Sequence, residues 1–190
     1  VCGNPSDGVA GYTNYPSNSF GNSMNASIWM RHDYVGTIGT GNSLGGRTLT
    51  HEAGHWLNLA HTWGSTNEPG LASNCNTDDN VIDTPNTIGT TWCNQNDTSC
   101  GPLGNTENYM NYASCRKMFT PGQANRMRAA LTSSVGGRDN LWQTSNLIAT
   151  GTLSAPTLCN VNFETNKPVI CSGDSVAFTD LSFHNISSWN

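Results

Sequence analysis

Charged residues are scarce in this chain, and positively charged ones especially so. Of its 190 residues, 11% are charged, and 8 Lys and Arg against 13 Asp and Glu give a net charge of -5. The sequence contains no basic run, which argues against nucleic acid or an anionic membrane surface as a partner. It also contains no apolar run of the ~18 residues that a membrane span needs, so we expect no transmembrane segment.

The chain also lacks a Cys-x-x-Cys pair, although it holds 7 cysteines. Such pairs are typical of thiolate metal sites, so a cysteine-ligated metal is disfavoured. Disulfide bonding in an oxidising compartment is the better interpretation, and we expect a secreted, extracellular protein. The sequence opens at Val1 without an initiator methionine or a signal peptide, so we expect any targeting segment to lie outside it.

The most informative stretch is residues 51–61, HEAGHWLNLAH. On a helix, His51 and His55 lie four residues apart on one face and can point at one ion. Glu52 lies about 100° round the helix, within reach of a water on that ion. His61 can join the site only if the chain turns sharply after the helix. Asn58 stands where that turn is needed, and asparagine tolerates the left-handed conformation better than other non-glycine residues.

Three neutral imidazoles with a fourth position left for water are typical of a catalytic zinc site. A structural zinc site is usually closed by four protein ligands. The alternative is that these are ordinary helix histidines, since a bare HExxH often arises by chance. The extended motif gathers three of the chain's 5 histidines into one short stretch, and this favours a metal site.

Hydrophobic patterning predicts an α+β fold. Residues 9–12 and 27–32 are expected to form strands, and residues 43–59 the helix that carries the motif. A second helix is predicted from Pro121 to about Thr132, with Thr120 as N-cap and Gln123 completing a capping box. Residues 138–155 are expected to be a connection, and alternating segments after residue 155 predict a separate β domain.

Residues 62–108 show little periodicity and must be fastened by something, because loops of this length are uncommon in compact domains. Two disulfides would serve, and spacing alone leaves all three pairings of Cys75, Cys93, Cys100 and Cys115 open. Oxygen-bearing residues in this loop are suited to calcium, or they are solvated turn residues; the two readings are equally supported. These residues are Asp78, Asp79, Asp83, Thr84 and Asn86.

Several motifs in order resemble the pappalysin-type metzincins, a group of secreted zinc endopeptidases. The sequence GRTLT leads into HEAGHWLNLAHTWG, and DTPN follows at residues 83–86. The sequence NYMNY at residues 108–112 resembles the Met-turn, and FTPGQ at residues 119–123 resembles the start of the last helix. The resemblance covers roughly residues 1–132.

This resemblance implies a metzincin-like catalytic domain over residues 1–150, with a twisted sheet, an active-site helix, a Met-turn and a C-terminal helix. Its first strands and first helix are expected to precede Val1. Residues 155–190 resemble the start of a PKD-type β-sandwich, which is common in large exported bacterial proteins. We therefore expect a bacterial source and a second domain that acts as a spacer or contacts a surface or polymer.

The resemblance further implies roles for individual residues. Zinc would be bound by His51, His55 and His61, with Glu52 as general base and protein or peptide substrates. Met110 would form the floor of the metal site, and Tyr112 would donate a hydrogen bond to the oxyanion. Calcium would lie near residues 78–86. The implied disulfides are Cys75–Cys100 and Cys93–Cys115.

One departure concerns specificity. In relatives that cleave before Arg or Lys, an acidic residue shortly after the Met-turn lines the S1′ pocket. Here Ala113, Ser114 and Cys115 follow, with no carboxylate, so a basic preference is not implied. Two other functions remain open. One is a different zinc enzyme with a downstream glutamate ligand, for which Glu68 and Glu107 are the candidates; the other is a non-catalytic adhesin or scaffold that retains a peptidase fold.

Overall fold

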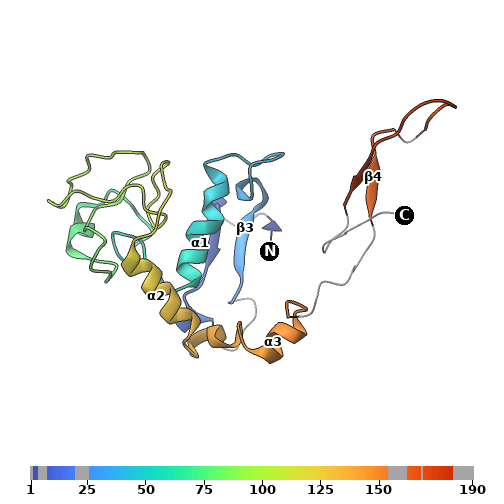
Figure 1. The fold of residues 1–190 in the computed structure, drawn as a ribbon. Helices are drawn as coiled ribbons and strands as arrows, with labels where there is room; N and C mark the ends of the chain where they lie inside the picture. Colours follow the sequence, from blue (N-terminus) through green and yellow to red (C-terminus); the bar gives the residue numbers. More distant parts are fainter. Residues whose placement is uncertain (1, 4–7, 20–25, 154–161, 168, 182–190) are drawn as a thin grey trace. The chain divides into compact units, whose positions relative to one another are not determined.

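A computed structural model describes residues 2–3, 8–19, 26–153, 162–167 and 169–181 (Figure 1). The chain divides into two compact units, Val1–Asn140 and Leu141–Asn190. The predicted domain limits, 1–150 and 155–190, stay a prediction, because compactness alone does not establish the identity of a domain.

A small sheet forms one layer of the first unit. Its strands are β1 (Cys2–Gly3), β2 (Gly11–Thr13) and β3 (Ile28–Arg31), in the order β1-β3-β2. β1 runs parallel to β3, and β2 runs antiparallel to it. Tyr12 and Trp29 are partners in the register, and their rings stack with centroids 6.1 Å apart. Both strands predicted for this region are confirmed, each shorter than expected.

The helix that carries the motif, α1 (Thr48–Trp56), packs against β2 and β3 (Figure 1). It begins five residues later than expected and is preceded by a 3-10 helix, η4 (Gly45–Arg47). The reason is local. The Asn42 side-chain carbonyl accepts the backbone N–H groups of Leu44 at 3.1 Å and Gly45 at 2.8 Å, which replaces the helical bonding pattern there.

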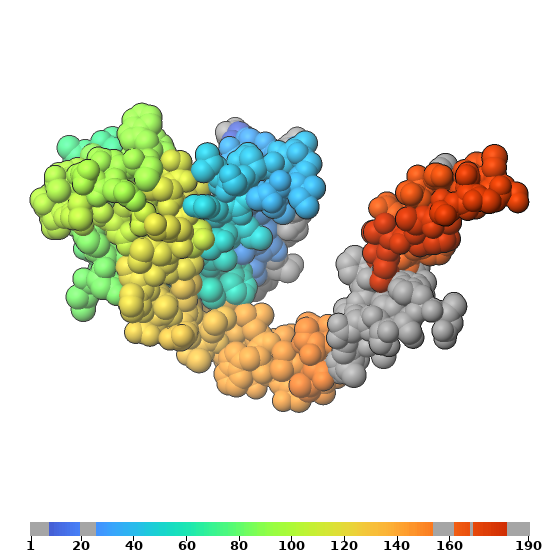
Figure 2. Space-filling model, turned by 45° about the horizontal axis from the view of Figure 1, so that its top comes forward, coloured from blue at the N-terminus to red at the C-terminus, as the bar shows by residue number. Residues whose placement is uncertain are grey.

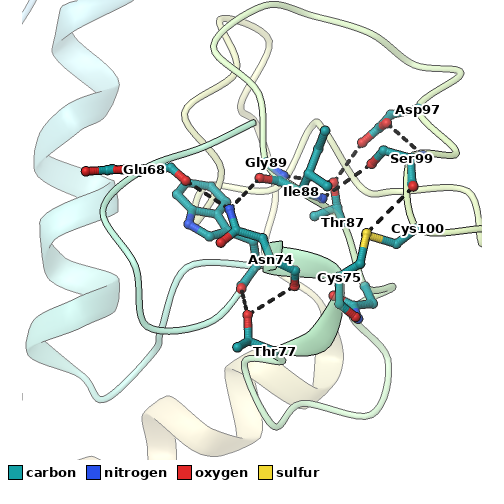
Figure 3. The surroundings of a disulfide bond; sticks show 12 residues. Glu68, Asn74, Cys75, Thr77, Thr87, Ile88, Gly89, Asp97, Ser99 and Cys100 are labelled. Carbon is teal, nitrogen blue, oxygen red and sulfur yellow. Dashed lines mark hydrogen bonds between the residues drawn. A yellow bond between two sulfur atoms is a disulfide. The ribbon is translucent and has the colours of Figure 1, made fainter. Parts of the chain in front are cut away.

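The long segment after α1 contains a single short 3-10 helix among its described elements, η5 (Ala72–Asn76). The disulfides Cys75–Cys100 and Cys93–Cys115 fasten it, which confirms the expected pairing. Figure 3 shows the first disulfide beside Asn74, which is 1% exposed and donates to the carbonyls of Glu68 and Ile88, each at 2.9 Å. In Figure 2 this segment, in green, forms one close-packed lobe.

The second long helix, α2 (Pro121–Leu131), begins as the sequence predicts. The Thr120 hydroxyl accepts from the Gln123 backbone N–H at 3.1 Å, and the Gln123 side chain accepts from the Thr120 N–H at 3.0 Å. Short 3-10 helices complete the unit. They are η2 (Pro16–Asn18), η3 (His32–Tyr34) and η6 (Val135–Asn140).

The second unit holds a short helix, α3 (Thr144–Ala149), where the sequence predicts only a connection. Its two strands, β4 (Phe163–Thr165) and β5 (Phe178–Asp180), pair antiparallel. This agrees with the predicted strand character of the region, while a β-sandwich of the PKD type stays a prediction. Within the described parts of the chain, none of the helices has the length and apolar character needed to cross a bilayer.

Candidate metal centre

Three histidine side chains converge on one point. His51 and His55 come from consecutive turns of α1, and His61 follows the turn after the helix. The Nε2 atom of His55 lies 3.1 Å from that of His51 and 3.1 Å from that of His61. Within the described chain this is the one group of at least three His, Cys, Asp or Glu residues whose candidate ligand atoms lie close enough, within 4.8 Å, to hold a metal. The predicted ligands are therefore brought together.

The outer nitrogen of each ring is fixed by a backbone carbonyl. Nδ1 of His51 lies 2.6 Å from the Tyr109 carbonyl, which belongs to the Met-turn segment. Nδ1 of His55 lies 2.7 Å from the Leu59 carbonyl, and Nδ1 of His61 lies 3.0 Å from that of Thr66. A carbonyl only accepts, so each Nδ1 carries the proton. Each Nε2 lone pair is thereby left for a metal.

Burial keeps these imidazoles neutral. It lowers the pKa of His51 well below its ordinary value and lowers that of His55 as well. The pKa of His61 falls to about 3, first through burial and then through the neighbouring His55. Neutral imidazole is the form that binds metal, so the environment prepares the ligands before any ion arrives.

The turn that returns His61 to the site occurs at Asn58. Its φ of 73° lies in the left-handed region, as the sequence predicts for this position. The Leu59 N–H bonds back to the Gly54 carbonyl at 2.9 Å, which closes the end of α1. Arg126 on α2 donates from Nε to the Asn58 carbonyl at 2.8 Å, so the two helices hold the turn between them.

Met110 is fully buried and packs against α1 at Gly54. A Cβ atom built on Gly54 would clash with the Met110 sulfur, so this glycine lets the methionine approach α1 between the two helical histidines. The Asn108 side chain accepts from the Met110 N–H at 2.8 Å and forms the tight turn. The role of Met110 as the floor of the metal site stays a prediction.

Glu52 is 6% exposed and lines the same cleft as the three histidines, a cavity of about 670 Å³. Burial raises the pKa of Glu52 to about 7, while the Arg116 guanidinium acts in the opposite direction. A carboxyl group with a pKa near neutrality is suited to accept and return a proton.

Tyr112 also lines this cleft. Its ring centroid lies 5.4 Å from that of His51 and 4.9 Å from that of His61. Burial raises the pKa of the Tyr112 phenol to about 12, so it stays protonated and can donate. This position is compatible with the predicted oxyanion donor.

Two residues at the site do not stand out in the sequence. Trp63 is fully buried and stacks on His61, with centroids 4.5 Å apart and planes 5° apart. Trp63 lies in the aperiodic segment, and only its nearness to the motif in the sequence could have indicated a place at the site. Arg116 lines the cleft and follows Cys115, where no pattern marks it.

The candidate calcium residues are held by different contacts. Asp83 accepts from the Thr120 hydroxyl at 2.7 Å and the Gly122 N–H at 2.8 Å, so it binds the start of α2. Asp79 is 1% exposed, and its Oδ1 accepts from the Thr84 hydroxyl at 2.6 Å. Asp79 Oδ2 and Asn86 Oδ1 are buried and have no hydrogen-bond partner.

The three-histidine site passes the chemical test for zinc. Its donors are neutral nitrogen atoms, their outer nitrogens are anchored, and one side of the cluster opens onto the cleft. No thiolate or carboxylate closes a fourth position among the described residues. The arrangement is that of a catalytic rather than a structural zinc site.

Curated relatives share the region around the motif. An extracellular metalloprotease of Arthroderma benhamiae is 39% identical over 87 residues, which cover 43% of this chain and 30% of that protein. An extracellular metalloprotease of Verticillium alfalfae is 38% identical over 91 residues, which cover 45% of this chain and 30% of that protein. The chain thus spans about 30% of the length of these relatives. They are fungal proteins and give no support to the expected bacterial source.

Solved structures share the fold. Mature mirolysin of Tannerella forsythia, in complex with a cleaved peptide, is 31% identical with a TM-score of 0.61, covering 76% of this chain and 55% of that one. Mirolysin in complex with compound 9 is 30% identical with a TM-score of 0.61, and the match covers 76% of this chain and 56% of that one. This likeness supports the predicted metzincin-like catalytic fold. A family model described as pregnancy-associated plasma protein-A also matches residues 4–132, most of the chain, so the protein belongs to this peptidase family, M43.

Proposed function

We propose that this chain carries the catalytic centre of a secreted zinc endopeptidase that hydrolyses peptide bonds in proteins or peptides. The observation that carries the proposal is the convergence of three anchored Nε2 atoms beside a buried glutamate in one cleft. Membership of family M43 and the extracellular metalloproteases among its relatives support it.

In this proposal, His51, His55 and His61 hold zinc. The chemistry that zinc supplies when bound is Lewis-acid activation of a water and of the scissile carbonyl. Glu52 accepts a proton from the attacking water and delivers it to the leaving amine, for which a pKa of about 7 is suited. The Tyr112 hydroxyl donates a hydrogen bond to the oxyanion of the tetrahedral species.

The geometry argues against the two alternatives. A zinc enzyme with a downstream glutamate ligand would need Glu68 or Glu107 at the centre. The cluster found among the described residues holds neither, and Glu107 pairs with Lys117 at 2.7 Å. A scaffold without catalysis has no need of a buried Glu52 in the cleft. We therefore propose a catalytic role over an adhesin.

The test compares cleavage of a proteome-derived peptide library by wild-type protein and Glu52→Gln, each with its zinc content measured. We expect Glu52→Gln to keep one zinc per chain and to lose about 10²- to 10⁴-fold in rate. The matched control is Glu68→Gln, an exposed glutamate in the same part of the chain, which should retain activity. Equal activity of Glu52→Gln and wild type would contradict the proposal, as would a zinc-loaded wild-type protein that cuts no peptide.

We also propose calcium as a second, structural ion in the 78–86 region. The supporting observation is the pair of buried oxygens, Asp79 Oδ2 and Asn86 Oδ1, that lack a donor. Buried polar atoms are normally paired, and an oxygen left unpaired is suited to a hard cation. Asp78 and Thr84 stay candidate ligands in this proposal. The Asp83 carboxylate already caps α2, so its part would be to support the loop.

The remaining features of the proposal lie outside the metal centre. The two disulfides and the extracellular relatives support secretion. A PKD-type domain over residues 155–190, with contacts to a surface or polymer, stays a prediction. The bacterial source likewise stays a prediction.

A further inference from the structure

Arg116 gives the cleft beside the metal centre a fixed positive charge. Of the residues that line this cleft, Glu52 and Arg116 are the two with ordinarily charged side chains apart from histidine. Glu52 is already assigned to proton transfer. The only positive charge left to meet a substrate, among the described lining residues, is therefore the Arg116 guanidinium.

The backbone that carries Arg116 is held from three sides. The preceding residue, Cys115, is bonded to Cys93. Arg47, immediately before α1, donates from its guanidinium to the Arg116 carbonyl. The next residue, Lys117, bonds through its backbone N–H to the Glu107 carbonyl at 2.7 Å. The side chain thus projects from a rigid support rather than from a free loop.

The Arg116 guanidinium has no fixed acceptor among the residues that the structure describes. Its Nε is buried without a hydrogen-bond acceptor, and none of the ion pairs among the described residues involves Arg116. Arg47 is a nearby like charge, while Glu52 attracts Arg116 without forming an ion pair with it. A buried donor left unpaired beside a second cation favours the arrival of an anion.

We infer that Arg116 is a specificity-determining residue that selects peptides with a carboxylate next to the scissile bond. A planar guanidinium matches a carboxylate in geometry, and the bond is stronger in a partly buried cleft than in water. The carboxylate is an Asp or Glu side chain, because a C-terminal carboxylate next to the scissile bond would make the enzyme an exopeptidase rather than the proposed endopeptidase. This inference rests on the proposed peptidase function and defines its substrate class.

The experiment measures kcat and KM of the full chain with zinc on matched peptides. Asp, Glu, Asn, Gln or Lys is placed at each position flanking one cleavage site, and each peptide is made with a free and an amidated C-terminus. We expect acidic peptides to be cut about 10- to 100-fold more efficiently than their amide counterparts. Preference for an internal Asp or Glu supports the inference. Preference for a free C-terminus in place of an internal acidic residue would overturn it, because the ligand would then be the terminal carboxylate.

Variants then test the residue. Arg116→Gln should remove the acidic preference by raising KM for acidic peptides. Any change in kcat should be the same on acidic and neutral peptides, because loss of the guanidinium also acts on the pKa of Glu52. Arg116→Glu should favour lysine peptides instead. The matched control is Arg128→Glu, an exposed arginine on α2 outside the cleft, which should change neither preference nor rate.

Binding gives a second readout that does not depend on turnover. In calorimetry, zinc-loaded Glu52→Gln should bind an acidic peptide more tightly than the matching Asn or Gln peptide. The double variant Glu52→Gln with Arg116→Gln should bind the two peptides with equal affinity. Cleavage of neutral and acidic peptides at equal efficiency would overturn the inference and leave the peptidase standing. An Arg116→Gln variant that keeps the acidic preference, whatever its kcat, would also overturn it. Cleavage of no peptide by the zinc-loaded wild type would overturn the proposed function itself.

Discussion

The Nε of Arg126 on α2 donates a 2.8 Å hydrogen bond to the carbonyl of Asn58, the residue at which the chain turns after α1. Asn58 has a φ of 73°, and three residues later His61 reaches the metal centre. The position of the third ligand therefore depends on one left-handed residue and one arginine from a distant helix.

Replacement of Asn58 by a β-branched residue tests this dependence. Asn58→Val should destabilise the fold by about 1–2 kcal/mol, because β-branched side chains disfavour positive φ. Zinc affinity should fall about 10-fold or more as His61 shifts. The matched control is Asn80→Val, since Asn80 has a φ of 58°. It should lose similar stability in chemical denaturation and retain zinc affinity; equal zinc loss in both variants would contradict a specific role for Asn58.

The close approach of Met110 to α1 predicts that Gly54 tolerates no side chain. Gly54→Ala should cost about 1–3 kcal/mol of unfolding free energy, because its Cβ meets the buried Met110 sulfur. Gly45→Ala is the control, since its nearest neighbours lie 3.4 Å from an added Cβ. Chemical denaturation of both variants checks the prediction. A Gly54→Ala variant as stable as Gly45→Ala would show that Met110 does not pack as described.

Tyr112 should act on the rate rather than on metal binding. Tyr112→Phe removes one donor from the cleft and should lower kcat about 10²- to 10³-fold with zinc content unchanged. Tyr109→Phe is the neighbouring control, because Tyr109 contacts His51 through its backbone carbonyl and not through its phenol. Steady-state kinetics with zinc analysis separates the two. Loss of zinc from Tyr112→Phe would indicate a structural role instead.

The raised pKa of Asp79 predicts how the stability of the fold depends on pH and on calcium. Burial raises the pKa of Asp79 to about 6 from its ordinary value of 3.8. The folded state therefore holds this proton more tightly than the unfolded state. The resulting stabilisation is complete below the unfolded pKa and is lost as the pH rises through about 6. Without divalent ions, wild type should lose about 1–2 kcal/mol relative to Asp79→Asn between about pH 4 and pH 8, allowing for solvent screening.

Calcium should reverse this penalty, since it favours the ionised carboxylate. Melting temperature at about pH 8 should rise with added calcium in wild type and much less in Asp79→Asn. Asp174→Asn, in the second unit, serves as a matched control that should respond like wild type. An identical calcium response in wild type and Asp79→Asn would rule out Asp79 as a ligand.

Local features of this protein were predictable from the sequence wherever the cause is itself local. The spacing of His51 and His55 follows from the period of a helix, and the capping box at Thr120 follows from backbone donors that need an acceptor. The predicted start of α1 was wrong. The Asn42 side chain binds backbone N–H groups that a helix would otherwise use, and hydrophobic patterning contains no information about such hydrogen bonds.

The motif at residues 51–61 was enough to predict three candidate metal ligands, a candidate general base and the turn at Asn58. Which residues from remote segments lie beside them follows only from the packing of the whole unit. Trp63 stacks on His61 from within an aperiodic segment, and Arg116 enters the cleft because Arg47, 69 residues earlier, binds its backbone. Periodicity carries information over a few turns, whereas a contact between distant segments depends on how the whole core packs.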